Sequence, residues 1–286
     1  MSPHRALAIG LIAPAFALLA LVLISPAAYG FWYTLFRIEY GAPTDFIGLQ
    51  NYRWLLEETK FAGLLSRSAV FTASAVAITT VIALALAAWI HRLPRRQGFL
   101  VQLVVIVPWI ISTVVATLLF RWVFVNDIGI AVWAFQALGL GNFQPLNSAG
   151  GAMALLVAVS VWKRIGYAVI VLLAGLKSIP GELEEAATVD GAGAWQIFRR
   201  ITLPLLKTPL LLVVIVLTLS NLNTVETPLV MTGGGPGDAT RILPMEVYEL
   251  AFAKYDFGAA ATLAILMFAG NVLLVLGYVR LARWKV

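Results

Sequence analysis

Six long apolar runs constrain this 286-residue sequence more than any other feature. Each exceeds the roughly 20 residues that an α-helix needs to cross a bilayer, where every backbone amide must be paired. We therefore predict an all-α, polytopic membrane protein with six transmembrane helices in a single domain, residues 1–286. The predicted spans are approximately 7–36, 64–90, 99–124, 151–175, 209–231 and 259–282.

The composition also indicates a membrane protein, and it argues against a nucleic-acid partner and against a catalytic or metal site. Hydrophobic residues make up 61% of the chain and charged residues only 12%, against about 25% charged in globular domains. The formal charge of +6 comes mainly from basic residues that flank the apolar runs, so we expect no nucleic-acid partner. Without cysteine, and with only His4 and His91, the chain offers no catalytic or metal-ligating cluster.

The first apolar run has a second interpretation. Ser25-Pro26-Ala27 is weakly similar to a signal-peptide cleavage site. The run is longer than the 7–15 residues of a signal-peptide core, so we expect it to be retained as the first span.

The charges between the spans predict their direction. With a cytoplasmic amino terminus, the inner segments hold 11 basic and four acidic residues, and the outer segments hold seven basic and nine acidic. The short segment 91–96, HRLPRR, is the clearest signal. The positive-inside rule thus places both termini and residues 177–208 in the cytoplasm.

Residues 185–204, EAATVDGAGAWQIFRRITLP, form a polar segment within this cytoplasmic loop. Pro180 suits the first turn of a short helix, and the following glutamates complement its positive end. Gly191 and Gly193 permit a sharp turn. A second apolar stripe then runs at helical spacing to Ile201, where Pro204 interrupts it.

This segment resembles the EAA loop of ABC-importer permeases, by which the membrane subunit docks on its cytoplasmic ATPase. The resemblance implies that Glu185 makes a polar contact with the ATPase, Gly191 sets the bend, and Phe198 and Ile201 fill a cleft. An ordinary amphipathic loop helix is the alternative. The residues assigned to coupling are Glu185, Ala186, Ala187, Gly191, Phe198, Ile201, Leu203 and Pro204.

Two expected outer loops carry further resemblances. Residues 46–52, FIGLQNY, are similar to a motif that the same family often carries. The last outer loop, with MTGGGP at 231–236 and DFGAA at 256–260, resembles that of carbohydrate-uptake permeases, specifically the first-permease subunit of maltose, glycerol-phosphate or lactose systems. A glycine-rich turn is the alternative for this loop.

The resemblance implies a type I ABC importer transmembrane domain in a bacterial or archaeal inner membrane. It implies four partners: a second permease in a heterodimer, an ABC ATPase dimer, an extracytoplasmic sugar-binding protein and the lipid bilayer. The chain lacks the G-x-x-x-x-G-K-[ST] phosphate loop, so we expect no cofactor on it, with ATP and magnesium bound by the ATPase.

Charged and amide side chains within spans indicate a pathway for a polar solute. Lys163, Arg164 and Glu226 are costly in lipid, and either form a structural salt bridge or line a water-filled cavity. On a continuous fifth helix, Asn223, Glu226 and Thr227 share one face, which suits sugar hydroxyls or simply joins helices. Trp109 or Trp162 could stack on the apolar face of the sugar. Pro108 and Pro228 could break or bend their helices.

An unpaired Lys163 or Arg164 would favour an anionic sugar, phosphorylated or sulfonated. Two other functions remain open from the sequence. An ion-coupled secondary transporter needs coupling carboxylates near the midplane and usually an inverted repeat, and Glu226 is the single candidate. A membrane scaffold has no need for a polar face inside a span.

Overall fold

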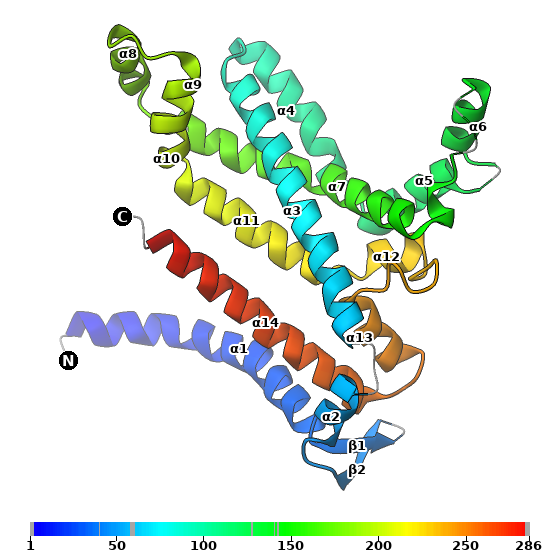
Figure 1. Ribbon diagram of the computed structural model, residues 1–286. Helices are drawn as coiled ribbons and strands as arrows, with labels where there is room; N and C mark the ends of the chain where they lie inside the picture. Colours follow the sequence, from blue (N-terminus) through cyan, green and yellow to red (C-terminus); the bar gives the residue numbers. More distant parts are fainter. Residues whose placement is uncertain are drawn as a thin grey trace. The chain divides into compact units, whose positions relative to one another are not determined.

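The computed structural model describes residues 3–39, 41–57, 61–126, 128–139, 141 and 143–283. These residues form helices and one short β-hairpin, and they divide into two compact units (Figure 1). Unit 1 consists of Met1–Ala62 with Glu246–Gly270, and unit 2 of Gly63–Met245 with Asn271–Val286. Helix α14, Phe257–Arg283, contributes to both.

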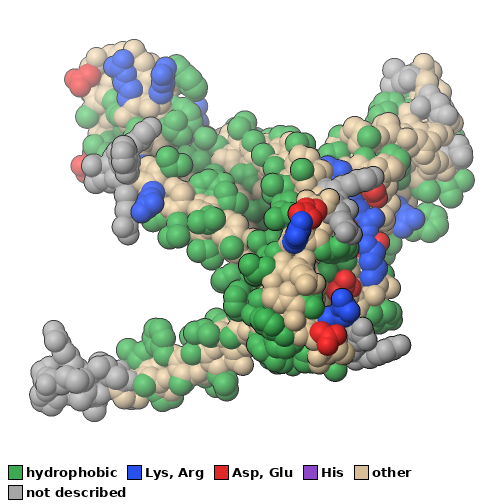
Figure 2. All heavy atoms as spheres, turned by 60° about the horizontal axis from the view of Figure 1, so that its bottom comes forward, with side chains coloured by type: hydrophobic (Ala, Val, Ile, Leu, Met, Phe, Trp, Pro, Cys, Tyr) green, Lys and Arg blue, Asp and Glu red, His purple; other side chains and the backbone are tan. Residues whose placement is uncertain are grey.

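The all-α polytopic fold is confirmed. Within the described residues, four helices are long and apolar enough to cross a membrane, and two further bent helix pairs bring the possible number of spans to six. These helices expose many large apolar side chains, and hydrophobic side chains are spread over the face seen in Figure 2, as expected of helices that face lipid or another subunit. The four helices are Ile12–Tyr33, Phe61–His91, Ala149–Lys177 and Phe257–Leu281.

Unit 1 joins the long first helix to the last one through compact loops. Its elements are α1 (Pro3–Tyr33), β1 (Phe36–Glu39), β2 (Ala42–Phe46), α2 (Gln50–Glu57), most of α13 (Leu243–Phe252) and the first half of α14. The strands pair antiparallel around Gly41, whose φ of 79° is a conformation that glycine adopts without steric cost.

The two family-like outer motifs meet within unit 1. The Asn51 amide donates to the carbonyl oxygens of Thr34 (2.9 Å) and Phe36 (3.2 Å). A Cβ added at Gly258 would lie 3.1 Å from both the Asn51 Nδ2 and the Phe36 carbonyl oxygen, so only glycine fits here without displacement. Asp256 caps α14 by accepting from the Ala259 amide at 3.0 Å.

Unit 2 is built around α7, the most buried of the four long helices. Buried side chains of α7 pack with α3 and α11, and Ala83 and Ala87, one turn apart on α3, are fully buried. Small residues let membrane helices approach closely. The elements of unit 2 are α3 (Phe61–His91), α4 (Arg95–Ile110), α5 (Thr113–Phe124), α6 (Ile130–Ala137), η1 (Pro145–Asn147), α7 (Ala149–Lys177), α8 (Gly181–Val189), α9 (Ala194–Ile197), η2 (Phe198–Thr202), α10 (Leu203–Leu205), α11 (Lys207–Leu222) and α12 (Glu226–Met231).

Glycines permit the closest helix contacts in this unit. A Cβ on Gly166 of α7 would lie 2.5 Å from the Val105 carbonyl oxygen and 2.9 Å from the Ile106 Cα, both backbone atoms of α4. A Cβ on Gly175 would lie 2.6 Å from Pro209 at the start of α11. Both distances are well inside van der Waals contact, so α4 and α11 reach α7 only because these positions lack side chains.

The third span, predicted over 99–124, is a bent pair of helices. Helix α4 ends at Ile110 and α5 begins at Thr113, with a 93° bend between them. Ile111 has an extended backbone conformation that interrupts the helical hydrogen bonds. Pro108 lies inside α4, which continues to Ile110, so the break falls three residues after the proline to which it was assigned.

The predicted fifth span over 209–231 is interrupted as well. Helix α11 ends at Leu222, and α12 starts at Glu226 after a short break. Asn223, Glu226 and Thr227 therefore do not share one face of a continuous helix. Pro228 lies in the first turn of α12, where a missing amide hydrogen is tolerated, so it helps to start a helix instead of breaking one.

Candidate functional site

A polar cluster joins α7 to the carboxyl-terminal end of α11, inside the predicted spans. The Arg164 guanidinium donates to the hydroxyls of Ser160 and Ser220, each at 2.8 Å, and to the Ser220 carbonyl oxygen at 3.1 Å. The buried Ser160 hydroxyl in turn donates to the Asn221 side chain. Within the described chain, Arg164 has only neutral hydrogen-bond partners, although Glu226 lies close enough to interact with it electrostatically.

Lys163, one residue earlier, has a different role. Its side chain is 6% exposed, and its ammonium donates to the carbonyl oxygen of Ile111, the residue that directly follows α4. Carbonyl groups at a helix carboxyl terminus lack intrahelical partners and carry partial negative charge, which a lysine complements. Lys163 thus caps the broken third span, and in the described residues it forms no ion pair with Glu226.

The break between α11 and α12 exposes several polar groups. Asn223 Nδ2 donates to the Leu219 carbonyl oxygen at 2.7 Å, and its Oδ1 accepts from Asn271 of α14 at 3.2 Å. Glu226 is exposed and accepts from the Thr224 hydroxyl at 3.4 Å. Thr227, by contrast, is buried, and its hydroxyl has no partner in the part of the chain that the structure describes.

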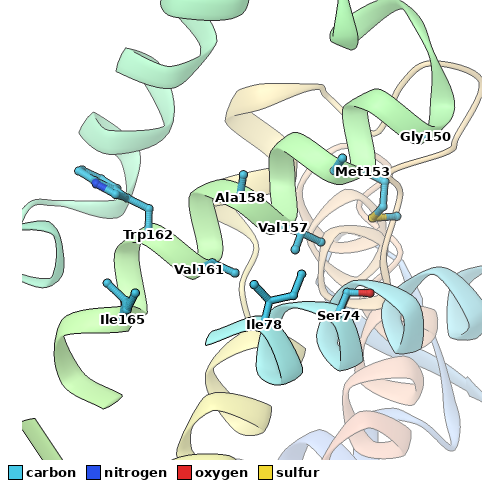
Figure 3. Close-up of a pocket in the computed structure, with 10 residues that line it drawn as sticks. Ser74, Ile78, Gly150, Met153, Val157, Ala158, Val161, Trp162 and Ile165 are labelled. Carbon is cyan, nitrogen blue, oxygen red and sulfur yellow. The ribbon is translucent and has the colours of Figure 1, made fainter. Parts of the chain in front are cut away.

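The two tryptophans assigned to sugar stacking lie in apolar surroundings. Trp109, near the end of α4, is half exposed and lies 6.0 Å from the Tyr167 ring centroid. Trp162 packs on Phe120 at 5.1 Å and lies at one end of a groove of about 710 Å³ between α3 and α7 (Figure 3). Ile78, Val157 and Val161 line that groove, so it resembles a surface for lipid or another helix more than a sugar site.

Arg164 on α7 bonds directly to Ser220 on α11, and Asn223 and Glu226 follow at the end of α11 and the start of α12. Ser220, Asn223 and Glu226 are exposed in the isolated chain. Charged and amide groups at membrane depth face a water-filled cavity or a partner instead of lipid. The cluster offers both donors and acceptors, as binding of a polyhydroxyl solute requires. Ser160 and Asn271 were not selected from the sequence, because they lie on other helices that only the fold brings to this region.

The coupling segment forms the predicted pair of short helical arms around a glycine turn. Helix α8 ends at Val189, and Gly191 follows with a φ of 80°. Gly193 has an ordinary negative φ of −72° and precedes α9; its amide donates to the Gln196 side chain at 3.2 Å. Only Gly191 therefore needs the conformational freedom of glycine. A contact between the Thr202 hydroxyl and Glu184 Oε1 at 3.3 Å joins the two arms.

The most exposed apolar side chains of this segment are not Phe198 and Ile201, the two expected to fill a cleft in the ATPase. Phe198 and Ile201 are partly buried within the segment, and Trp195 stacks on Phe198 at 5.6 Å. Val189 (87% exposed) and Trp195 (70% exposed) are instead its most exposed large apolar side chains. Their positions follow from the turn at Gly191, which sequence periodicity alone does not specify.

The remaining coupling residues lie on both arms. Glu185 and Ala186 are exposed on α8, and Ala187 is partly buried. Leu203 and Pro204 belong to the short α10, which follows a single π-helical turn, η2. The wider turn accommodates a proline ring that would clash with a regular helical carbonyl. The chain then bends by 67° into α11.

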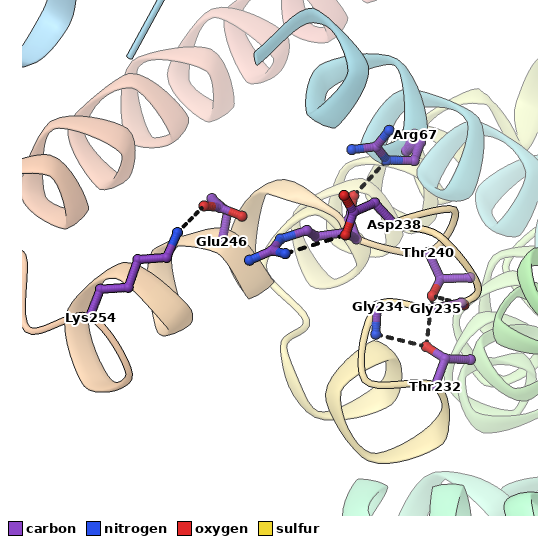
Figure 4. Close-up of polar contacts among 9 residues, drawn as sticks. Arg67, Thr232, Gly234, Gly235, Asp238, Thr240, Glu246 and Lys254 are labelled. Atoms are coloured by element: carbon purple, nitrogen blue, oxygen red, sulfur yellow. Dashed lines mark hydrogen bonds and ion pairs between the residues drawn. The ribbon is translucent and has the colours of Figure 1, made fainter. Parts of the chain in front are cut away.

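The glycine-rich segment 231–240 is held by its own threonines (Figure 4). The hydroxyls of Thr232 and Thr240 lie 2.7 Å apart, and Thr240 also donates to the Gly235 carbonyl oxygen at 2.7 Å. Arg67 of α3 donates to the Arg241 carbonyl oxygen at 2.8 Å. These bonds hold the glycine-rich segment in one conformation and attach it to α3.

The described residues contain no group of three or more His, Cys, Asp or Glu side chains arranged to bind a metal.

The chain matches the family of binding-protein-dependent transport system inner membrane components over residues 79–285. It is 33% identical over 283 residues to the sulfoquinovosyl glycerol transport system permease protein SmoG of Agrobacterium fabrum, covering 98% of this chain and 92% of that protein. It is 32% identical over 269 residues to the sn-glycerol-3-phosphate permease protein UgpA of Yersinia pestis, covering 93% and 89%.

A third relative, the trehalose/maltose permease protein MalF of Thermococcus litoralis, is 29% identical over 279 residues, covering 96% of this chain and 93% of that protein. Among solved structures, a bacterial ABC transporter involved in alginate import has the same fold, with a TM-score of 0.85 at 20% identity, covering 99% of this chain and 96% of that one. This protein is a member of the family of binding-protein-dependent inner membrane transport components, and is a multi-pass permease subunit of an ABC importer.

Proposed function

We propose that this permease imports a carbohydrate or carbohydrate derivative as one half of a heterodimeric pathway. The relatives named for sulfoquinovosyl glycerol, glycerol phosphate and trehalose or maltose support this substrate class. The proposed complex contains a second permease, two copies of an ABC ATPase and an extracytoplasmic sugar-binding protein. The whole chain acts as one domain, with ATP and magnesium bound on the ATPase and no cofactor on this chain.

The proposed orientation follows the distribution of basic residues. Both termini and the loop 177–208 lie in the cytoplasm, because Lys and Arg concentrate in the inner segments. ATP-driven closure of the ATPase then moves this loop, and the loop tilts the attached spans between inward-open and outward-open states. Of all the observations, the bent coupling segment around Gly191 supports this function best.

In this proposal the exposed Glu185, Val189 and Trp195 contact the ATPase. Glu185 and Glu184 are adjacent, but only Glu184 bonds to Thr202 of the opposite arm. We therefore expect Glu185→Ala to weaken co-purification of the ATPase without lowering the thermal midpoint of the permease. Glu184→Ala should instead lower the thermal midpoint of the permease, because it removes the bond to Thr202. A triple variant with alanine at Glu185, Val189 and Trp195 should lose the ATPase. Retention of the ATPase by this variant would refute the assigned contact surface.

Arg164 leads to a more specific substrate proposal. Its guanidinium has neutral hydrogen-bond partners, among them the exposed Ser220 of α11, whereas the Lys163 ammonium is engaged by Ile111. We assign Arg164 to an anionic group of the carbohydrate. Proteoliposomes that contain the complete importer test this assignment by uptake of neutral and acidic sugars.

We expect Arg164→Gln to lose preference for the acidic sugar while ATP-dependent uptake of any accepted neutral sugar persists. An unchanged preference would contradict the assignment. Uptake that follows an ion gradient and needs no ATP would contradict the importer function itself.

A further inference from the structure

A basic pocket is lined by residues that belong neither to the polar cluster nor to the coupling segment 185–204. It has a volume of about 540 Å³ and is lined by Arg95, Arg96, Phe99 and Gln102 at the start of α4 and by Lys177 at the end of α7. The three cationic side chains are exposed, and in the described part of the chain none of them forms an ion pair with a carboxylate. We propose that this pocket binds the phosphate headgroup of an anionic phospholipid.

The start of α4 adds positive potential to the pocket. Pro94 precedes the helix and supplies no side-chain cap, and the first turn contains no acidic residue. The amides of this turn and the macrodipole therefore favour an anion beside Arg95 and Arg96. With Lys177 opposite, three positive charges surround a space large enough for a lipid headgroup.

The surrounding side chains indicate a lipid as the source of the phosphate. Directly after the basic pair, α4 presents Phe99, Leu100 and Leu103, all about half exposed and all apolar. Trp89, half exposed, lies on the last turns of α3. Aromatic side chains concentrate at the membrane–water interface, and apolar ones follow at acyl-chain depth. A soluble phosphate compound makes no use of this adjoining apolar surface.

The proposal rests on the cytoplasmic orientation given above, which places the pocket at the inner leaflet. Headgroup binding would link α4 to α7, the helix that carries Lys163 and Arg164. The predicted lipid is therefore a structural ligand of the permease at the boundary between the spans and the coupling loop.

The test uses the assembled importer in nanodiscs that contain equal amounts of phosphatidylglycerol and phosphatidylcholine. Native mass spectrometry counts the phosphatidylglycerol that stays bound after release from the disc. A basic side chain near the surface contributes about a fivefold increase in affinity for anionic lipid, so Arg95→Gln combined with Lys177→Gln should lower this affinity roughly 25-fold.

The matched control combines Arg92→Gln with Arg280→Gln. Both residues are exposed and lie in segments expected on the same membrane side, but neither lines the pocket, so lipid retention should stay near the wild-type level. The charge-preserving pair Arg95→Lys and Lys177→Arg should also retain the lipid. This pair separates loss of charge from a failure to fold.

Three outcomes would overturn the proposal. Equal phosphatidylglycerol retention by the wild type and the Gln double variant would exclude the pocket. Displacement of the lipid by excess inorganic phosphate would indicate a small-anion site. Loss of the ATPase subunit with unchanged lipid retention would indicate that the basic pocket contacts an acidic protein surface. The lipid measurement needs no sugar, so a failure of the carbohydrate proposal leaves its result interpretable.

Discussion

Substitution of Gly166 by alanine tests the close packing of α4 on α7. The added Cβ would lie 2.5 Å from the Val105 carbonyl oxygen, whereas ordinary contact begins at 3.4 Å, so the α4 backbone must move by about 0.9 Å. Backbone cannot rotate away as a side chain can. We expect an overpacking cost of about 3 kcal/mol, reduced by about 1 kcal/mol because alanine favours the helix more than glycine.

The resulting net loss of about 2 kcal/mol should lower the thermal midpoint by roughly 4–8 °C in a chain of this size. The assay is thermal unfolding of the purified permease in detergent. Gly277→Ala is the matched control, because that position lies in α14 with no atom within 4 Å of the added Cβ. Its midpoint should be unchanged or slightly higher. Equal midpoints for the two variants would refute the proposed approach of α4 to α7.

Three further predictions concern single contacts. Lys163→Met keeps the length of the side chain but removes the bond to Ile111, so it should cost about 1–3 kcal/mol, measured as a lower thermal midpoint. Asp256→Ala removes the cap of α14 and should cost about 1 kcal/mol, whereas Asp256→Asn should cost little. Gly191→Ala forces a left-handed backbone conformation at about 1–2 kcal/mol and should reduce ATPase co-purification, whereas Gly193→Ala should not. Each alanine or methionine variant that behaves like its control or the wild type would contradict the contact assigned to it.

Helix type and approximate position were predictable from the sequence because they depend on local properties. Apolar runs of more than 20 residues identified the long helices, and Gly191 identified the turn in the coupling segment, where the structure gives it a positive φ. The membership of the chain in a permease family was predictable for the same reason, since its motifs are short and contiguous. The assignment of individual residues to coupling remains a prediction.

Helix breaks were assigned to Pro108 and Pro228, but the actual break points, at Ile111 and after Leu222, could not be predicted, because tertiary contacts stabilise them. Nothing near Ile111 in the sequence shows that Lys163, 52 residues away, supplies a partner for its carbonyl oxygen. Likewise, Arg164 meets Ser220 only because α7 packs beside α11. Helical periodicity placed Asn223 and Glu226 on one face under the assumption of a continuous helix, and that assumption failed at Leu222.

The contact between Asn51 and Gly258 determines when part of this protein is able to fold. The two residues are separated by about 200 positions, a length that a ribosome synthesises in roughly 10–40 s. During that interval the segment around Thr34 and Phe36 lacks the first turn of α14, which later packs against it. A chain truncated before α14 should therefore leave the segment around Asn51 and Phe36 exposed on the side that Gly258 covers, even though its first five apolar segments are already present.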